Sequence, residues 1–257
     1  MARGRLPHIP SWGLGTPPRR VRLLAVLAVR DEMHNLPGWF RNVAPHVDGV
    51  AALDDGSTDG SAEFLASRPE VLELLRIPPD RPGWDEVGNY RLLVQAALRQ
   101  GADWIVSLDA DHRVEWRFRT RAERVIRRGD RLGFSAYAFR LRELWGAPDH
   151  YRTDGVWGEK LRARLFQARP DHAFDERPLH ASKAPEQSRV AGGFPRADLE
   201  VYHLRMISSA DRVARRARYE ALDPGQRYQP VEGYAYLTDE RGLKLKRVPL
   251  DRRWREA

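Results

Sequence analysis

Three pairs of acidic side chains follow three apolar runs of the sequence, and together they could bind a cation or a polyhydroxylated ligand. The pairs are Asp31 and Glu32, Asp54 and Asp55, and Asp109 and Asp111. Carboxylates in a shared cleft repel one another unless such a ligand holds them together. The alternative is that each carboxylate only caps a following helix, where its charge also suits the helix dipole.

The apolar runs have the pattern of strands that are buried on both faces of a parallel sheet. We expect strands over 23–29, 47–53, 71–77 and 104–108. Helical spacing of apolar residues predicts three helices. The first is capped by Asn35, the second is capped by Ser57 or Thr58, and the third begins near Asp85. This alternation predicts an α/β fold with a mostly parallel sheet and helices on both faces. Ligands bind beyond the carboxyl ends of such strands, where the acidic pairs stand.

The remainder of the chain has a looser pattern. We expect a basic helix over 116–128, strands over 134–144 and 160–166, and a helix that begins at Ser208 or Ser209 and ends near residue 222. Residues 1–20 form a basic extension rich in Pro and Gly, which predicts a flexible segment. Residues 223–257 are a polar C-terminal tail. The expected organisation is a single domain with flexible ends.

Composition excludes several classes of protein. Hydrophobic residues make up 42% of the 257 residues and charged residues 31%, which suits a chain with a buried core. No apolar run approaches twenty residues, so we expect no integral membrane segment and no secretion signal. Cysteine is absent, which excludes disulfides, thiolate zinc sites and thiol catalysis and fits a cytoplasmic protein.

The chain has a formal net charge of +8, and all but four of its 44 basic residues are arginine. A basic surface could bind nucleic acid, an anionic membrane surface or a phosphorylated substrate. The arginines are spread along the sequence, so genomic composition explains them equally well. Peripheral membrane contact therefore stays open, and nucleic acid is not the expected partner.

Three motifs in order resemble family 2 glycosyltransferases. The stretch 54–61, Asp-Asp-Gly-Ser-Thr-Asp-Gly-Ser, resembles the signature after the second strand, 108–111 resembles the Asp-X-Asp metal motif, and 29–36 resembles the exit of the first strand. The resemblance implies the Rossmann-like GT-A fold, a nucleotide-diphosphate sugar donor, a divalent metal and inversion at the anomeric carbon. It assigns donor binding to 21–115 and acceptor binding to 116–222.

The resemblance also implies roles on the metal side of the site. Asp111 would bind Mn²⁺ or Mg²⁺ directly, and Asp109 would face the ribose or a water on the metal. His203 resembles a histidine that completes the metal or diphosphate site, although a structural histidine at a strand end is an equal alternative. Arg205 could pair with a phosphate oxygen. His180 is a weaker candidate of the same type.

On the nucleotide side, the resemblance places Asp55, perhaps joined by Asp54, at the base and ribose, since an ionised carboxylate only accepts hydrogen bonds. Glu32 belongs to the same donor-binding set. Asn89 and Arg91 stand where relatives present polar groups to nucleotide or phosphate, although Arg91 equally fits a solvated helix surface. UDP is the expected nucleotide.

Inverting transfer needs a carboxylate that takes the proton of the acceptor hydroxyl. We expect Asp175 or Glu176 in this role. The His-Glu pair of some relatives is not preserved, because Ala181 follows His180.

Two other functions stay open, a sugar-phosphate nucleotidyltransferase and a basic, non-enzymatic module that binds nucleic acid. The first needs a Gly-rich loop after the first strand, where Arg30 to Glu32 contain no glycine.

Overall fold

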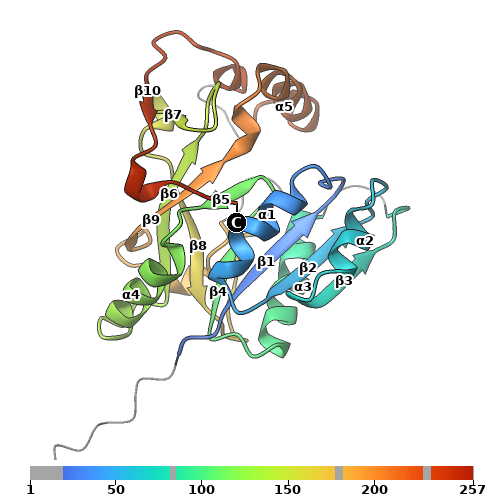
Figure 1. Cartoon of the computed structure of the whole chain (residues 1–257), viewed down its shortest axis with the longest axis vertical. Coiled ribbons are helices and arrows are strands. Elements are labelled where there is room, and N and C mark those ends of the chain that lie inside the picture. The colour runs from blue at the N-terminus through green and yellow to red at the C-terminus, as the bar shows by residue number, and fades with distance from the viewer. Residues whose placement is uncertain (1–19, 82–84, 177–181, 228–232, 257) are drawn as a thin grey trace, which may run out of the picture.

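A mixed sheet of eight strands runs through the molecule (Figure 1). The computed structural model describes residues 20–81, 85–176, 182–227 and 233–256. The strands, in spatial order, are β3 (Val71–Ile77), β2 (Val50–Asp55), β1 (Leu23–Val29), β4 (Trp104–Ser107), β8 (Leu161–Gln167), β6 (Ala136–Glu143), β9 (Arg196–His203) and β5 (His112–Val114). A separate ribbon pairs β7 (His150–Arg152) with β10 (Leu245–Arg247). The predicted α/β class with a mostly parallel sheet is confirmed.

The directions of the strands determine which strand ends lie at the same edge of the sheet. Strands β3, β2, β1 and β4 are parallel, and β6 pairs parallel with β9. Because β8 is antiparallel to both β4 and β6, the strands β6 and β9 point the same way as β4. The carboxyl ends of β1, β2, β4, β6 and β9 therefore lie at one edge of the sheet, which we call the carboxyl rim.

Helices cover both faces of the sheet, as expected. The α-helices are α1 (Leu36–Val43), α2 (Ser61–Ala66), α3 (Glu86–Arg99), α4 (Phe118–Asp130) and α5 (Ser209–Leu222). Short 3-10 turns span Ala44–His46, Gly155–Trp157, Glu186–Ser188, Leu204–Met206, Ala235–Leu237 and Leu250–Arg252. Alternate residues of β1 separate the two core layers: Leu27 packs with α1 and α4, and Val26 packs with α3. None of the described helices combines the length and hydrophobicity that a bilayer crossing needs.

Helix starts differ from the expected ones in two places. Asn35 does not cap α1 through its side chain, because its Nδ2 donates to Glu32 Oε2 at 2.7 Å. Helix α2 begins after Gly60, whose φ of +90° is a left-handed conformation that glycine adopts easily, rather than at Ser57 or Thr58. The expected start of α3 is confirmed, since Asp85 accepts from the Gly88 N–H at 2.8 Å.

Two strands also depart from the expected pattern. Strand β2 begins at Val50 instead of residue 47, because the turn Ala44–His46 continues the chain past α1. Strand β5 has only three residues, too few for a period-2 pattern, and was not expected. It pairs with β9, which aligns His112 with His203.

The segment 233–256, expected as part of a polar tail, packs against the rest of the fold. Tyr234 and Leu237 are buried with Trp145 and Trp157 in a separate hydrophobic cluster. Farther along, Glu256 forms ion pairs with Arg41 of α1 and with Arg113, and the chain ends beside α1 in Figure 1. This segment is therefore part of the folded body. The expected flexible extension 1–20 lies, except for residue 20, outside the described residues.

Candidate metal and nucleotide site

Four of the candidate side chains lie at the carboxyl rim. Asp55 is the last residue of β2, while Asp109 and Asp111 follow β4. His203 is the last residue of β9 and pairs in register with Glu143, the last residue of β6. The sheet thus brings carboxylates and a histidine from four strands to one edge.

Asp111, His112 and His203 form a buried cluster that could hold a metal ion. One ligand atom from each residue lies within 4.8 Å of the others. His203 Nε2 lies 3.1 Å from Asp111 Oδ2, and the His112 and His203 rings meet edge to face at 5.1 Å between centroids. Leu204 N–H donates to the Asp111 carbonyl at 2.9 Å, which fixes the backbone beside the carboxylate. Carboxylate and imidazole together suit Mn²⁺ better than a purely apolar or thiolate set would.

The charges in this cluster keep Asp111 ionised. Burial alone would raise the pKa of Asp111, but the nearby His203 and Arg205 hold that pKa well below its usual range. Burial lowers the pKa of His112 to about 3, so this ring is neutral at pH 7. The Asp109 N–H donates to His112 Nδ1 at 3.1 Å, which leaves the proton of the neutral ring on Nε2. In this tautomer His112 offers no lone pair, so Asp111 and His203 are the better ligand pair.

Glu143 and Lys160 support His203 from behind. Glu143 Oε2 lies 2.5 Å from His203 Nδ1, and its other oxygen pairs with Lys160. A histidine that donates from Nδ1 to a carboxylate presents Nε2 toward a metal, which is the common arrangement in metalloproteins. The two carboxylates raise the pKa of His203 although burial opposes the shift. Loss of the second ring proton would free Nε2 for a cation, so the residues present fit a divalent ion.

Asp109, expected near the metal, is held by an arginine. Arg164 of β8 donates two hydrogen bonds of 2.9 Å to the two oxygens of Asp109. Half of the Asp109 side chain, 51%, stays exposed, whereas Asp111 is only 7% exposed. Asp111 thus lies inside the cluster, whereas Asp109 is half exposed at its border, with Oδ2 3.5 Å from His112 Nε2.

Asp55, Asn89 and Arg81 form a second polar group at the rim. Arg81 donates to Asp55 Oδ1 at 2.5 Å and to Asn89 Oδ1 at 2.9 Å. Asp55 and Asn89 are both buried. Asp55 Oδ2, Asn89 Nδ2, Arg81 Nε and Asp54 Oδ1 have no hydrogen-bond partner among the described residues. Buried polar atoms without partners are rare in folded proteins, and a bound ligand is one way to satisfy them.

The loops after β1 and β2 are tied together by their acidic residues. Asp31 has a φ of +54° and accepts from the Thr58 N–H at 2.7 Å, while Asp59 accepts from the Met33 N–H at 2.8 Å. Asp59 also accepts from the N–H of Ser61, the first residue of α2, at 3.0 Å. Asp54 accepts from the Ser57 N–H at 3.1 Å. These contacts are structural and shape the loop in front of Asp55.

Arg205 connects the loop that follows β1 to the metal cluster. Its Nε donates to Asp111 Oδ2 at 2.9 Å, and its Nη2 pairs with Glu32. Two carboxylates raise the pKa of Arg205 against the effect of burial, so the guanidinium is always charged. Arg205 and Glu32 were both expected at the donor, and the structure places them together beside Asp111.

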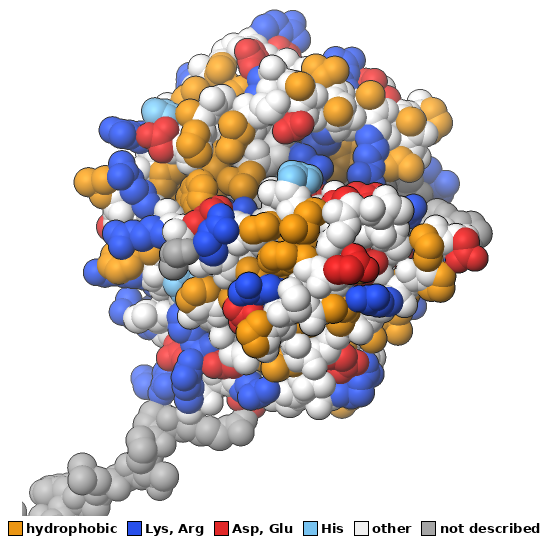
Figure 2. Space-filling model, turned by 45° about the vertical axis from the view of Figure 1, so that its right-hand side comes forward, with side chains coloured by type: hydrophobic (Ala, Val, Ile, Leu, Met, Phe, Trp, Pro, Cys, Tyr) orange, Lys and Arg blue, Asp and Glu red, His pale blue; other side chains and the backbone are white. Residues whose placement is uncertain are grey.

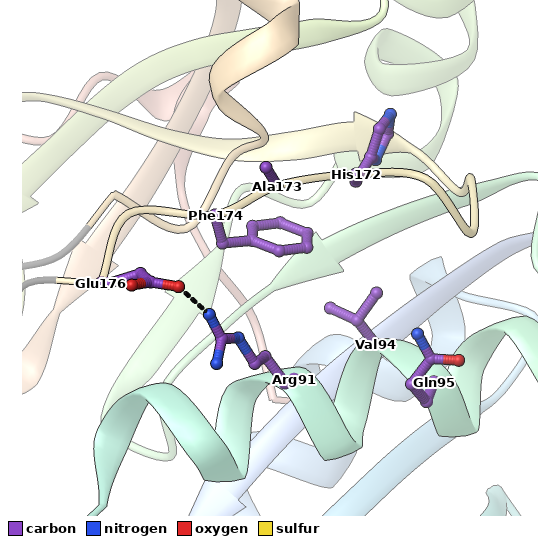
Figure 3. Close-up of a pocket in the computed structure, with 7 residues that line it drawn as sticks. All are labelled: Arg91, Val94, Gln95, His172, Ala173, Phe174 and Glu176. Carbon is purple, nitrogen blue, oxygen red and sulfur yellow. Dashed lines mark hydrogen bonds and ion pairs between the residues drawn. The ribbon is translucent and has the colours of Figure 1, made fainter.

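Arg91 of α3 and Glu176, from the segment after β8, form an exposed ion pair (Figure 3). They line a pocket with Val94, His172 and Phe174, and Figure 3 shows the Phe174 ring above α3. Asp175, the other expected base, accepts from the Ser182 N–H at 3.1 Å. His180 lies outside the described residues. The roles of Asp175, Glu176 and Arg91 stay predictions.

Five residues of the site were not expected from the sequence: His112, Glu143, Lys160, Arg81 and Arg164. Each acts across a long sequence separation, such as the 60 residues between Glu143 and His203. Glu143 ends the strand expected over 134–144, so its position after an apolar run was the available signal. Lys160 is the first residue of the strand expected over 160–166 and Arg164 lies in its interior; among so many basic residues neither carried a distinct signal.

Basic side chains do not form one continuous patch on the face shown in Figure 2, where acidic and apolar side chains lie between them. Many arginines pair with acids; Arg119, for instance, lies 2.7 Å from both Asp48 and Glu123. This pattern gives the nucleic-acid alternative no support on that face.

No protein-family model matches the chain. The chain is similar to uncharacterized proteins of Mycobacterium tuberculosis and Mycobacterium bovis, each 28% identical over 218 residues. These residues cover 81% of this chain and 52% of each relative, so the chain spans about half the length of the curated relatives it matches.

Solved structures similar to the chain are GT-A glycosyltransferases. TarS of S. aureus is 10% identical with a TM-score of 0.44, and the match covers 84% of this chain and 45% of that one. Glucosyl-3-phosphoglycerate synthase of Mycobacterium tuberculosis, in complex with Mn²⁺, UDP and glucosyl-3-phosphoglycerate, is 17% identical with a TM-score of 0.34 over 50% of this chain and 46% of that one. The chain itself is an α/β protein whose carboxyl rim holds a carboxylate–histidine cluster.

Proposed function

We propose that this protein is a metal-dependent glycosyltransferase that transfers a sugar from a nucleotide-diphosphate donor to an acceptor hydroxyl. One observation carries the proposal. The buried Asp111–His203 pair, which fits a divalent cation, shares the carboxyl rim with Asp55 and Asn89, each of which has one buried polar atom without a partner among the described residues. A ligand with a polar base at one end and a metal-binding diphosphate at the other would satisfy both groups.

The base end of the site favours uracil. Asp55 Oδ2 is a buried acceptor and Asn89 Nδ2 a buried donor, each without a partner among the described residues. The uracil ring presents an N–H donor between two carbonyl acceptors, so its edge matches a carboxylate beside an amide. Arg81 already donates to the Oδ1 atom of each side chain and would keep both oriented. We therefore assign UDP as the nucleotide.

The diphosphate would lie between Asp111, His203 and Arg205. A divalent ion held by Asp111 and His203 would stabilise the negative charge of the departing diphosphate as a Lewis acid. Arg205, fixed by Asp111 and Glu32, would present its remaining N–H groups to a phosphate oxygen. Asp109 would face the ribose or a water of the ion, since half of its side chain is exposed. Glu143 would hold His203 in the tautomer that leaves Nε2 toward the ion.

The transfer itself would invert the anomeric carbon. The acceptor oxygen forms a bond to that carbon while the bond to the diphosphate oxygen breaks, and the nucleoside diphosphate leaves with the electron pair. A carboxylate takes the hydroxyl proton. We assign Asp175 or Glu176 to this step; Glu176 now pairs with Arg91 and would have to exchange that partner. The cytoplasmic location and any peripheral membrane contact also stay predictions.

The direct test is a panel of nucleotide sugars incubated with the protein, with release of the nucleoside diphosphate as the readout. We expect hydrolysis of a UDP-sugar in Mn²⁺ or Mg²⁺, none in EDTA, and none by the Asp111→Asn variant. Exposed Asp80→Asn, in the loop after β3, is the matched control. Release that continues in EDTA at the same rate would contradict the assigned metal site.

A further inference from the structure

Two arginines near the metal cluster lack acidic partners, although the cations around them are all paired. Lys160 pairs with Glu143, Arg164 with Asp109, and Arg205 with Asp111 and Glu32. Among the described residues, Arg162 and Arg215 form no ion pair with any carboxylate. Arg162 donates only to the neighbouring Leu161 carbonyl, and Arg215 donates to the Tyr219 hydroxyl at 3.0 Å.

Arg162 stands beyond the end of β4. It follows Lys160 by two residues and precedes Arg164 by two, near the start of β8, whose later residues pair with β4. Since β8 is antiparallel to β4, the start of β8 lies at the carboxyl rim. Arg162 is exposed; desolvation and, second, the charge of Arg164 lower its pKa, while the charge of Glu143 opposes this shift.

Arg215 approaches the same place from α5, and its surroundings hold the guanidinium in position. The charges of Asp111 and Glu143 act on Arg215 and help to raise its pKa against desolvation. Arg215 also lies over the Tyr219 ring, with 5.2 Å from its Cζ to the ring centroid. Lys160 Nζ lies 5.1 Å from the centre of the Trp157 ring, and Trp157 belongs to the same hydrophobic cluster as Tyr219, so Lys160 and Arg215 border one aromatic cluster.

Unneutralised cations that gather in this way repel one another, and an anion between them would offset the repulsion. Guanidinium groups match the oxygens of phosphoryl and carboxyl groups through paired N–H donors. The donor diphosphate already has Asp111, His203 and Arg205 on the β4 and β9 side. Arg162 and Arg215 come from the part of the chain after residue 115, beyond the donor-binding strands.

We propose that Arg162 and Arg215 form an anion-binding subsite that holds a phosphoryl or carboxyl group of the acceptor. The inference rests on the proposed function and deepens it, because it names the acceptor class as an anionic molecule with a free hydroxyl. Such a charge would anchor the acceptor beside the metal cluster while its hydroxyl faces the donor sugar.

Calorimetric titration of inorganic phosphate into the protein saturated with UDP and Mg²⁺ tests the subsite, because UDP occupies the donor site. We expect phosphate to bind, and Arg162→Gln and Arg215→Gln each to weaken that binding about 10-fold or more. The affinity for UDP should change less than twofold. Arg216→Gln is the control, since Arg216 lies on the same helix and pairs with Glu220. Thermal unfolding verifies that all variants are folded.

The subsite is wrong if the UDP-saturated wild-type protein binds no phosphate, if both variants bind phosphate as tightly as wild type, or if they lose UDP affinity instead. Failure of the proposed function looks different, because wild-type protein would then bind no UDP. In that case phosphate is titrated into the wild-type protein and the same variants in the absence of UDP. A second arm compares glycerol 3-phosphate with glycerol as acceptors, and equal transfer to both would also overturn the inference.

Discussion

Glu143 Oε2 lies 2.5 Å from His203 Nδ1, and this contact turns the other ring nitrogen toward Asp111. Both residues end parallel strands, β6 and β9, and are paired in register. The orientation of a candidate metal ligand is thus built into the sheet rather than into a loop. Five predictions follow from this site and its surroundings.

Replacing Glu143 by Gln should weaken metal binding without abolishing it. The amide keeps the shape but no longer favours the tautomer in which His203 Nε2 is free, and loss of such a supporting partner costs roughly 10- to 100-fold in metal affinity. The measurement is Mn²⁺ binding by electron paramagnetic resonance. UDP binding in EDTA should stay at the wild-type value. Unchanged Mn²⁺ affinity would show that Glu143 does not position His203.

Asp111→Asn and Asp109→Asn should differ although the residues are two apart. Asp111 lies in the buried cluster, and a neutral amide oxygen is a poorer ligand for a hard cation, so its loss should reduce Mn²⁺ affinity sharply. Asp109 is held by Arg164, so its variant should retain most of that affinity. The same binding assay measures both variants. Equal losses would mean that Asp109 is also a direct ligand.

Asp55→Ala should weaken UDP binding with or without metal. Its buried carboxylate would accept a hydrogen bond from the base, and such a bond is worth about 1.5–3 kcal/mol. Asp111→Ala should matter only when Mn²⁺ is present. Titrations of UDP in Mn²⁺ and in EDTA separate the two effects, with exposed Asp80→Ala as control. If Asp55→Ala loses affinity only with metal, the base does not lie at Asp55.

Asn42 should be a stability residue with no role in binding. Its buried side chain accepts from the Val114 N–H at 2.7 Å and donates to the Arg255 carbonyl at 2.8 Å, so it connects α1, β5 and the C-terminal segment. Asn42→Ala leaves buried backbone groups unpaired, which should lower the free energy of unfolding by about 2–4 kcal/mol. Urea unfolding measures this change. Exposed Gln95→Ala should stay within about 0.5 kcal/mol of wild type.

His46 should make stability depend on pH below about 6.5. Burial and, secondarily, the charge of Arg119 lower the pKa of His46 in the folded protein. The unfolded chain therefore binds the proton first, and the free energy of unfolding should fall as the pH decreases from about 6.5 toward the folded pKa. His46→Gln should flatten this part of the profile. The control is His34→Gln, at an exposed histidine, and an identical slope in wild type and His46→Gln would contradict the prediction.

Local pattern was enough to predict the parallel half of the fold and the placement of its acidic residues. The run 23–29 is apolar throughout because β1 is buried on both faces, and such runs are visible in any window of the sequence. Parallel strands then bring Asp55, Asp109 and Asp111 to one rim without any knowledge of side-chain contacts. The relation of these carboxylates to the rim was therefore determined by the sequence itself.

Tertiary structure alone decided which of these groups face one another. The pairing of β6 with β9 joins residues about 60 positions apart. The period of the hydrophobic residues in a sequence indicates that a strand exists, but it does not indicate which strand pairs with it. For this reason Glu143 was missed as the partner of His203, and Arg164 was missed as the partner of Asp109. The same non-local packing decides which groups surround Arg162 of β8 and Arg215 of α5, because residues so far apart in the sequence come together only in the folded chain.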